Sequence, residues 1–199
     1  MKKIFFNILL IVTFCLIIVL TNACTKVERY YYPDGKLSSE ISKKHGVPNG
    51  CSRFYFHNGI SVKMESNYKE GKLDGYTTRW YFNGYKEAEE YYVDDLLEGK
   101  RRLWDEAGQL IVEDEYSGGV LNGYSRKWYP NGQLQIDAYY VNGKADGDWK
   151  YYDGNGIEVG YAHFNMGNGE QMILDKDGKV QKIIKFQDGV EVNYQGISE

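Results

Sequence analysis

Large side chains and glycines alternate along this chain with a fixed period. Seven glycines lie at intervals of mostly 24 or 25 residues: Gly35, Gly59, Gly84, Gly108, Gly132, Gly156 and a weaker copy, Gly178. Four residues before each stands a large residue, in order Tyr31, Tyr55, Trp80, Trp104, Trp128, Tyr152 and Leu174. A unit of this size cannot bury its own apolar face, so the period predicts repeats that stack on their neighbours.

Within each unit the pattern predicts a strand, a turn and a second strand. Residues 54–56, 79–82, 127–129 and 151–152 are rich in aromatic residues that favour strands, and a turn ending in glycine follows each run. The fold class expected is therefore all-β. We predict an elongated, twisted antiparallel sheet of about six to seven β-hairpin repeats over residues 30–195.

Two turn types are compatible with the recurring position of this glycine. A two-residue Asn-Gly turn would place Pro130, which lacks an N–H, in a hydrogen-bonded pair. A type I turn closed by a glycine bulge puts Pro33 and Pro130 at the second turn position and makes the glycine left-handed. This bulged register pairs residues of matching kind: Phe54–Val62, Arg79–Glu87, Leu103–Ile111, Lys127–Gln135 and Tyr151–Val159.

Strand alternation then assigns side chains to the two faces of the sheet. In this register Trp128 shares a face with Ile136, Ala138 and Tyr140, and Asp137 points the other way. The copies form one stacked aromatic ladder, which we predict to be the core and a hypothetical binding site: Tyr55, Trp80, Trp104, Trp128 and Tyr152. An acidic row is expected on the opposite face: Glu40, Glu65, Glu89, Glu113 and Asp137.

The N-terminus is typical of an export signal. Lys2 and Lys3 precede an apolar run over residues 4–20, and Ala23-Cys24 follows it. This ending resembles the lipobox of bacterial lipoproteins, which implies a signal peptide over 1–23, lipidation of Cys24 and a short tether over 24–29. An uncleaved membrane anchor and ordinary secretion are the alternatives. All three place the repeats outside the cytoplasm, and Thr25 after the cysteine favours a lipid anchor in the outer membrane.

Charge and residue usage exclude several classes of function. Without Lys2 and Lys3 the mature chain has 22 basic and 28 acidic residues, a net charge of −6, which disfavours nucleic acid as a partner. Loss of Cys15 with the signal and modification of Cys24 leave Cys51 as the sole thiol, so no internal disulfide is expected.

Catalytic and metal-binding patterns are not recognised in the sequence. His45, His57 and His163 lie in different repeats at different positions, so they form no ligand set, and we expect no metal and no cofactor. Carboxylates such as Glu87, Glu89 and the run at 113–115 recur from repeat to repeat, whereas a catalytic dyad is a single arrangement. The sequence therefore predicts a protein that is not an enzyme.

Three segments carry a resemblance to a known repeat. Residues 31–37 (YYPDGKL), 128–134 (WYPNGQL) and 68–75 (YKEGKLDG) resemble the variant MORN repeat of bacterial proteins, many of which are catalogued as YwqK-family antitoxins. The resemblance implies a sheet of hairpins with a binding or scaffolding role. We therefore expect a membrane-anchored repeat protein that binds another protein or a cell-envelope component. An antitoxin or immunity protein that neutralises a toxin by direct contact is the alternative.

Overall fold

The structure, a computed structural model, describes residues 25–196, so the expected signal over 1–23 and the lipidation site Cys24 lie outside the described residues. Seventeen β-strands and no helix occur in this part of the chain. Accordingly, residues 25–196 hold no helix with the length and apolarity that a membrane crossing requires. The chain divides into two compact units, with the boundary between Lys72 and Leu73.

Unit 1 contains five strands: β1 (Lys26–Tyr31), β2 (Leu37–Lys44), β3 (Val47–Pro48), β4 (Gly50–Tyr55) and β5 (Val62–Lys69). Strands β1, β3 and β4 each pair antiparallel with β2, and β5 pairs antiparallel with β4. Strand β1 begins at Lys26, so regular structure starts inside the segment expected as a tether.

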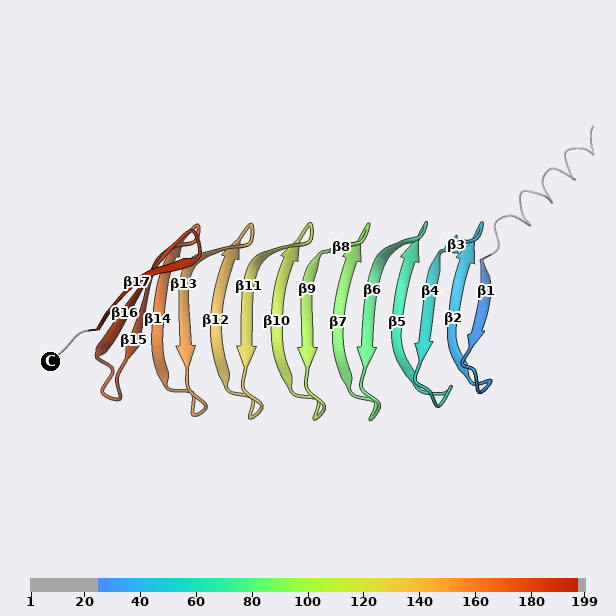
Figure 1. Ribbon diagram of the computed structural model, residues 1–199, viewed down its shortest axis with the longest axis horizontal. Helices are drawn as coiled ribbons and strands as arrows, with labels where there is room; N and C mark the ends of the chain where they lie inside the picture. The colour runs from blue at the N-terminus through green and yellow to red at the C-terminus, as the bar shows by residue number, and fades with distance from the viewer. Residues whose placement is uncertain (1–24, 197–199) are drawn as a thin grey trace, which may run out of the picture. The chain divides into compact units, whose positions relative to one another are not determined.

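Unit 2 contains the remaining strands, which lie side by side in chain order (Figure 1). They are β6 (Lys72–Trp80), β7 (Lys86–Val93), β8 (Leu96–Leu97), β9 (Gly99–Trp104), β10 (Leu110–Ser117), β11 (Val120–Trp128), β12 (Leu134–Val141), β13 (Lys144–Tyr152), β14 (Glu158–Asn165), β15 (Asn168–Leu174), β16 (Val180–Gln187) and β17 (Val190–Gly196). All pairings within this unit are antiparallel. The predicted all-β sheet of hairpin repeats is confirmed.

The turns have the predicted geometry. The N–H of Gly132 donates to the carbonyl of Tyr129 at 2.9 Å, and the N–H of Tyr129 donates to the carbonyl of Gln133 at 2.9 Å. Gly132 has a φ of +83°, in the left-handed region where a residue with a Cβ is strained. These bonds describe a type I turn closed by a glycine bulge, with Pro130 at the second position.

The strand register beyond the turn differs from the prediction. Trp128 lies opposite Leu134 as expected, but Lys127 lies opposite Ile136 and not Gln135. The other four predicted pairs are wrong in the same way, because the observed pairs are Phe54–Met64, Arg79–Ala88, Leu103–Val112 and Tyr151–Gly160. The returning strand carries an extra residue beside each turn, a second β-bulge. One extra residue moves every following side chain to the other face.

The predicted assignment of faces is therefore wrong. Arg126, two residues before Trp128 on β11, binds the carboxylate of Asp137 at 2.9 Å. Likewise Lys86 lies 5.6 Å from the ring centroid of Trp104 and also binds Glu89. The aromatic row and the acidic row share one face, which we call the ladder face. The opposite face, called the core face, carries the buried residues Ala88, Ala138, Ala162, Phe164 and Ile184.

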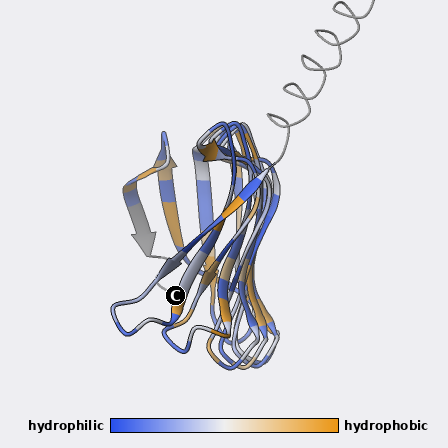
Figure 2. Cartoon of the chain, turned by 90° about the vertical axis from the view of Figure 1, so that its right-hand side faces the viewer, coloured by the Kyte–Doolittle hydropathy of each residue, from blue (hydrophilic) through white to orange (hydrophobic). Residues whose placement is uncertain are grey.

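The core face is built from small side chains flanked by rings. The repeat position of Ala138 is taken by Ser66, Ala162 and Ile184 in other repeats. Small polar residues are buried as well: Thr77 and Ser125 in unit 2, and Ser52 in unit 1. Phe164 on β14 contacts Trp149 at 4.9 Å and Phe186 at 5.5 Å between ring centroids. Burying one such aromatic side chain contributes about 1.5–3 kcal/mol. Polar and apolar residues alternate along the strands, as Figure 2 shows.

Hydrogen bonds between successive turns connect neighbouring repeats. The Tyr81 hydroxyl donates to the carbonyl of Trp104 at 2.9 Å, and the Tyr129 hydroxyl donates to the carbonyl of Tyr152 at 3.0 Å. Tyr32 makes the same bond to Tyr55 at 2.7 Å within unit 1. We call these bonds tyrosine braces. Each of these three bonds fixes one turn against the next turn along the chain.

Candidate functional site

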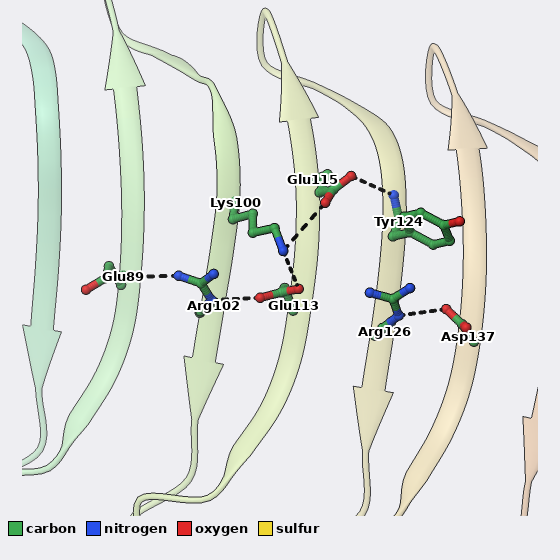
Figure 3. A network of polar contacts seen from close by, with 8 residues as sticks. All are labelled: Glu89, Lys100, Arg102, Glu113, Glu115, Tyr124, Arg126 and Asp137. Carbon is green, nitrogen blue, oxygen red and sulfur yellow. Dashed lines mark hydrogen bonds and ion pairs between the residues drawn. The ribbon is translucent and has the colours of Figure 1, made fainter.

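A network of charged side chains runs across the ladder face of unit 2 (Figure 3). Arg102 on β9 binds Glu113 on β10 at 2.7 Å and Glu89 on β7 at 3.5 Å. Lys100 binds Glu113 at 2.9 Å and Glu115 at 3.7 Å. These five residues form a continuous alternation of acids and bases over three strands.

The strand register explains why these charges meet. Arg102 lies directly opposite Glu113 in one pairing and directly opposite Glu89 in the other. Arg126 on β11 lies opposite both Glu113 and Asp137 in the same way, and its guanidinium binds Asp137. Opposite charges on facing positions of a sheet contribute about 0.2–1 kcal/mol per pair. The repeated sequence therefore places acidic and basic side chains in alternation across the sheet, and we call this arrangement the acid–base ladder.

Glu113 is held as a carboxylate at the centre of this network. Its side chain is 13% exposed. Burial alone would raise the pKa of Glu113, but hydrogen bonds from Lys100 and Arg102 outweigh burial and lower the pKa below its ordinary value of 4.5. A carboxylate stabilised in this way is a hydrogen-bond acceptor and a poor proton donor, which suits recognition better than acid–base chemistry.

Two tyrosine pairs, each with one exposed ring, flank the charged network. Tyr76 packs edge to face against Tyr91 with ring centroids 5.0 Å apart, and Tyr124 packs against Tyr139 at 5.1 Å. The guanidinium of Arg126 lies 4.3 Å from the centroid of the Tyr124 ring. Tyr76 is 57% exposed and Tyr124 is 44% exposed. Rings and arginine are the residue types that dominate the energy of protein interfaces.

Sequence reasoning missed these pairs, although a signal for them exists. Tyr76 and Tyr124 are 48 residues apart, which is two repeats. The same double period separates the brace residues Tyr81 and Tyr129. In the repeats that follow Tyr81 and Tyr129, Asp105 and Asp153 take the brace position, and each accepts backbone N–H groups of its own turn.

The predicted aromatic ladder is present as a row but its rings do not stack. Trp80, Trp104, Trp128 and Tyr152 end β6, β9, β11 and β13 of unit 2, and Tyr55 ends β4 of unit 1. All five are half-buried. Within unit 2 they lie on every second paired strand, so successive rings are about 10 Å apart. Side chains such as Leu110 and Leu134 lie between them, and no ring contact among residues 73–193 joins two of the four.

The core face carries a second, more deeply buried cluster of charges. Arg101 binds Glu90 at 3.2 Å and Asp114 at 3.4 Å. Glu90 also accepts a hydrogen bond from Arg79 at 3.1 Å, and Asp114 accepts one from the Ser125 hydroxyl at 2.7 Å. The carboxylates are 7% and 11% exposed as side chains. Each buried charge is therefore partnered, as burial in a low dielectric requires.

Cysteine and histidine occupy separate places in the described structure. Burial raises the pKa of Cys51, which keeps it as a thiol. His163 lies 2.7 Å from Asp148, and His57 stacks on Tyr32 with centroids 4.6 Å apart. Among residues 25–196 no three His, Cys, Asp or Glu side chains are grouped as metal ligands.

Comparison with protein families identifies the repeat itself. Residues 25–42, 97–117 and 121–142 match the family model described as MORN repeat variant. These three segments are similar to the variant MORN repeat. Each matched segment covers one hairpin or most of it: β1 with β2, β9 with β10, and β11 with β12. Two of the three segments that suggested the resemblance, 31–37 and 128–134, overlap these matches. A comparison with curated proteins found no match.

Proposed function

We propose that this protein is a membrane-anchored, non-enzymatic MORN-repeat protein that binds another protein or a cell-envelope component through its ladder face. The observation that carries the proposal is the surface formed by the tyrosine pairs and the acid–base ladder. Within residues 73–196 no helix or second sheet covers this face. Tyrosine and arginine beside paired charges are suited to bind a partner with complementary polar groups.

A partner in contact with this face can be captured and then measured. A photoreactive amino acid at position 124 would crosslink the partner in living cells, and the purified partner would then be titrated by calorimetry. We expect the triple variant Tyr76→Ser, Tyr124→Ser, Arg126→Ser to weaken binding at least about tenfold, because truncating such residues commonly costs more than 1 kcal/mol each. Ile157→Ser, at a turn residue that is 62% exposed, is the matched control and should bind as the wild type does.

Equal affinity of the triple variant and the wild type would contradict the proposal, provided that both have the same circular dichroism spectrum and melting temperature. The proposal would also be contradicted if position 124 gave no crosslinked product while a position on the core face did.

The anchor is a separate part of the proposal and has its own test. Lipidation of Cys24 predicts that a palmitate analogue labels the wild type and not Cys24→Ala. Fractionation of the envelope would then show whether the labelled protein is in the outer membrane. Labelling of both forms, or of neither, would refute lipidation at this residue. Co-expression with a toxin encoded beside the gene tests the alternative antitoxin role.

A further inference from the structure

An aromatic pocket lies at one end of the core face of unit 2. Its volume is about 270 Å³, and it opens beside the turns that join β12 to β13, β14 to β15 and β16 to β17. Five of the eleven residues that line it carry aromatic rings: Tyr140, Trp149, Tyr151, Phe164 and Phe186. A water molecule takes up about 30 Å³ in the liquid, so the pocket has room for a small organic group.

The rings of this wall are inclined to one another. Trp149 makes angles of 50° with Tyr140, 53° with Tyr151 and 59° with Phe164, and Phe164 makes an angle of 69° with Phe186. The wall is therefore curved and not a flat platform. A flat ring is suited to stacking against a sugar, whereas several inclined rings are suited to surround a compact rounded group. A cation is attracted to such ring faces by their negative quadrupole.

Hydrogen bonds hold the central ring in place without a ligand. The Trp149 indole N–H donates to the carbonyl of Tyr139 at 3.0 Å and also approaches the carbonyl of Asp146 at 3.3 Å. Its donor is therefore already used, so the indole can contact a ligand only through its ring atoms. A site preorganised in this way loses little entropy when a ligand binds.

The phenols of the wall are neutral, and one carboxylate stands at the mouth. Burial raises the pKa of the Tyr140 phenol, with a smaller contribution from the charge of Asp114, so this phenol is neutral at physiological pH. Burial raises the pKa of Tyr151 to about 12, so this phenol is neutral at physiological pH. At the mouth, the exposed side chains of Lys144 and Asp188 are paired at 3.6 Å. An entering cation can compete with Lys144 for the Asp188 carboxylate.

We propose that this pocket binds an alkylammonium group of the choline type, held by the faces of the surrounding rings and by Asp188. This site is independent of the ladder face, because the pocket residues are on the opposite face of the sheet or in the turns at its end. A neutral apolar group and a sugar are the other occupants that the experiment has to distinguish.

The test is a calorimetric titration of the full-length chain with choline chloride, the neutral carbon isostere dimethylbutanol, and N-acetylglucosamine. We expect choline to bind roughly tenfold more tightly than dimethylbutanol, the size of effect that a desolvated cation–π contact gives. Asp188→Asn should weaken choline binding several-fold, and Lys144→Gln should strengthen it, because the two changes alter the charge at the mouth in opposite directions. Neither change should alter the binding of the neutral isostere.

A ring deletion tests the wall of the pocket. Phe186→Leu retains an apolar side chain but removes one π face, so choline binding should weaken. Tyr161→Leu, on the same sheet at the ladder face of β14, is the matched control and should bind as the wild type does. If Phe186→Leu fails to fold by circular dichroism, the two exposed mouth variants decide the question.

Equal binding of choline and its neutral isostere would overturn the proposal in favour of an apolar ligand. Binding of N-acetylglucosamine alone would overturn it in favour of a sugar. A wild-type protein that gives no heat with choline, or charge variants at the mouth that change choline binding in the same direction, would also overturn it.

Discussion

The stability of the core face depends on Arg101, and the structure allows the cost of its loss to be estimated. Arg101→Met would remove ion pairs to Glu90 at 3.2 Å and to Asp114 at 3.4 Å. Glu90 would keep Arg79, but Asp114 would keep only the Ser125 hydroxyl. Removing one partner of a buried ion pair costs about 3–5 kcal/mol. Because the Arg101 side chain is 28% exposed, we expect a smaller loss than for a fully buried pair, about 2–3 kcal/mol.

The assay is urea unfolding followed by circular dichroism, together with thermal melting. A loss of this size lowers the melting temperature by about 5–10 °C in a domain of this length. The double variant Arg101→Met, Asp114→Asn should recover about 1–2 kcal/mol, because no unpaired charge then remains at Asp114. Lys150→Met, which removes an ion pair from a side chain 54% exposed, should change stability by less than about 0.5 kcal/mol.

Two outcomes would refute this reasoning. If Arg101→Met were as stable as the wild type, the ion pairs would contribute nothing measurable. If the double variant were no more stable than the single one, the orphaned carboxylate would not be the cause of the loss.

Three further predictions concern packing and pH. Gly169→Ala should destabilise by about 1–3 kcal/mol, because the added Cβ would lie 2.1 Å from the carbonyl oxygen of His163; Gly154→Ala, with no atom nearer than 4.0 Å, is the control for the same melting measurement. Tyr151 has a pKa of about 12 in the fold against an ordinary 10, so its contribution is complete below pH 10 and is lost as pH rises from 10 to 12. Tyr151→Phe should therefore lose less stability over that interval in alkaline unfolding titrations. The lowered pKa of Glu113 means that its ion pairs stabilise fully above pH 4.5 and progressively less as pH falls through and below that value. Glu113→Gln should flatten the acid limb of stability against pH, and an unchanged limb would argue against this ion-pair network.

Local turn chemistry allowed much of the fold to be predicted from the sequence. The spacing of glycines gave the repeat, and the place of Pro130 before Gly132 selected the turn that the structure contains. These features depend on a few adjacent residues whose backbone requirements are strict. For that reason the sequence alone is sufficient to predict them.

The faces of the sheet could not be predicted in the same way. The extra residue at the second bulge is Glu87, Ile111, Gln135 or Val159 in successive repeats. No residue type common to the repeats therefore indicates where this bulge lies. Side-chain size also gives a misleading prediction of the core. The sequence predicts the tryptophans in the core, but they are half-buried, whereas small residues such as Ala88 and Ala138 are fully buried.

Part of the candidate site was nevertheless visible in the sequence. The acidic row was recognised from its period, but its basic partners depend on the cross-strand register and so were not identified. The tyrosine pairs follow a period of two repeats, which comparison of single repeats does not reveal. The aromatic pocket depends on residues that depart from the repeat pattern. The main one is Trp149, which occupies the position that Ser125 and Thr77 have in earlier repeats.

The tyrosine braces have a direction along the chain. In each one the hydroxyl belongs to the earlier turn and the accepting carbonyl belongs to the turn 23 residues later. During synthesis or translocation from the N-terminus, each of these three donor hairpins is complete before the hairpin that accepts its bond. The donor can therefore help to fix its successor as that successor forms, at alternate steps along the chain.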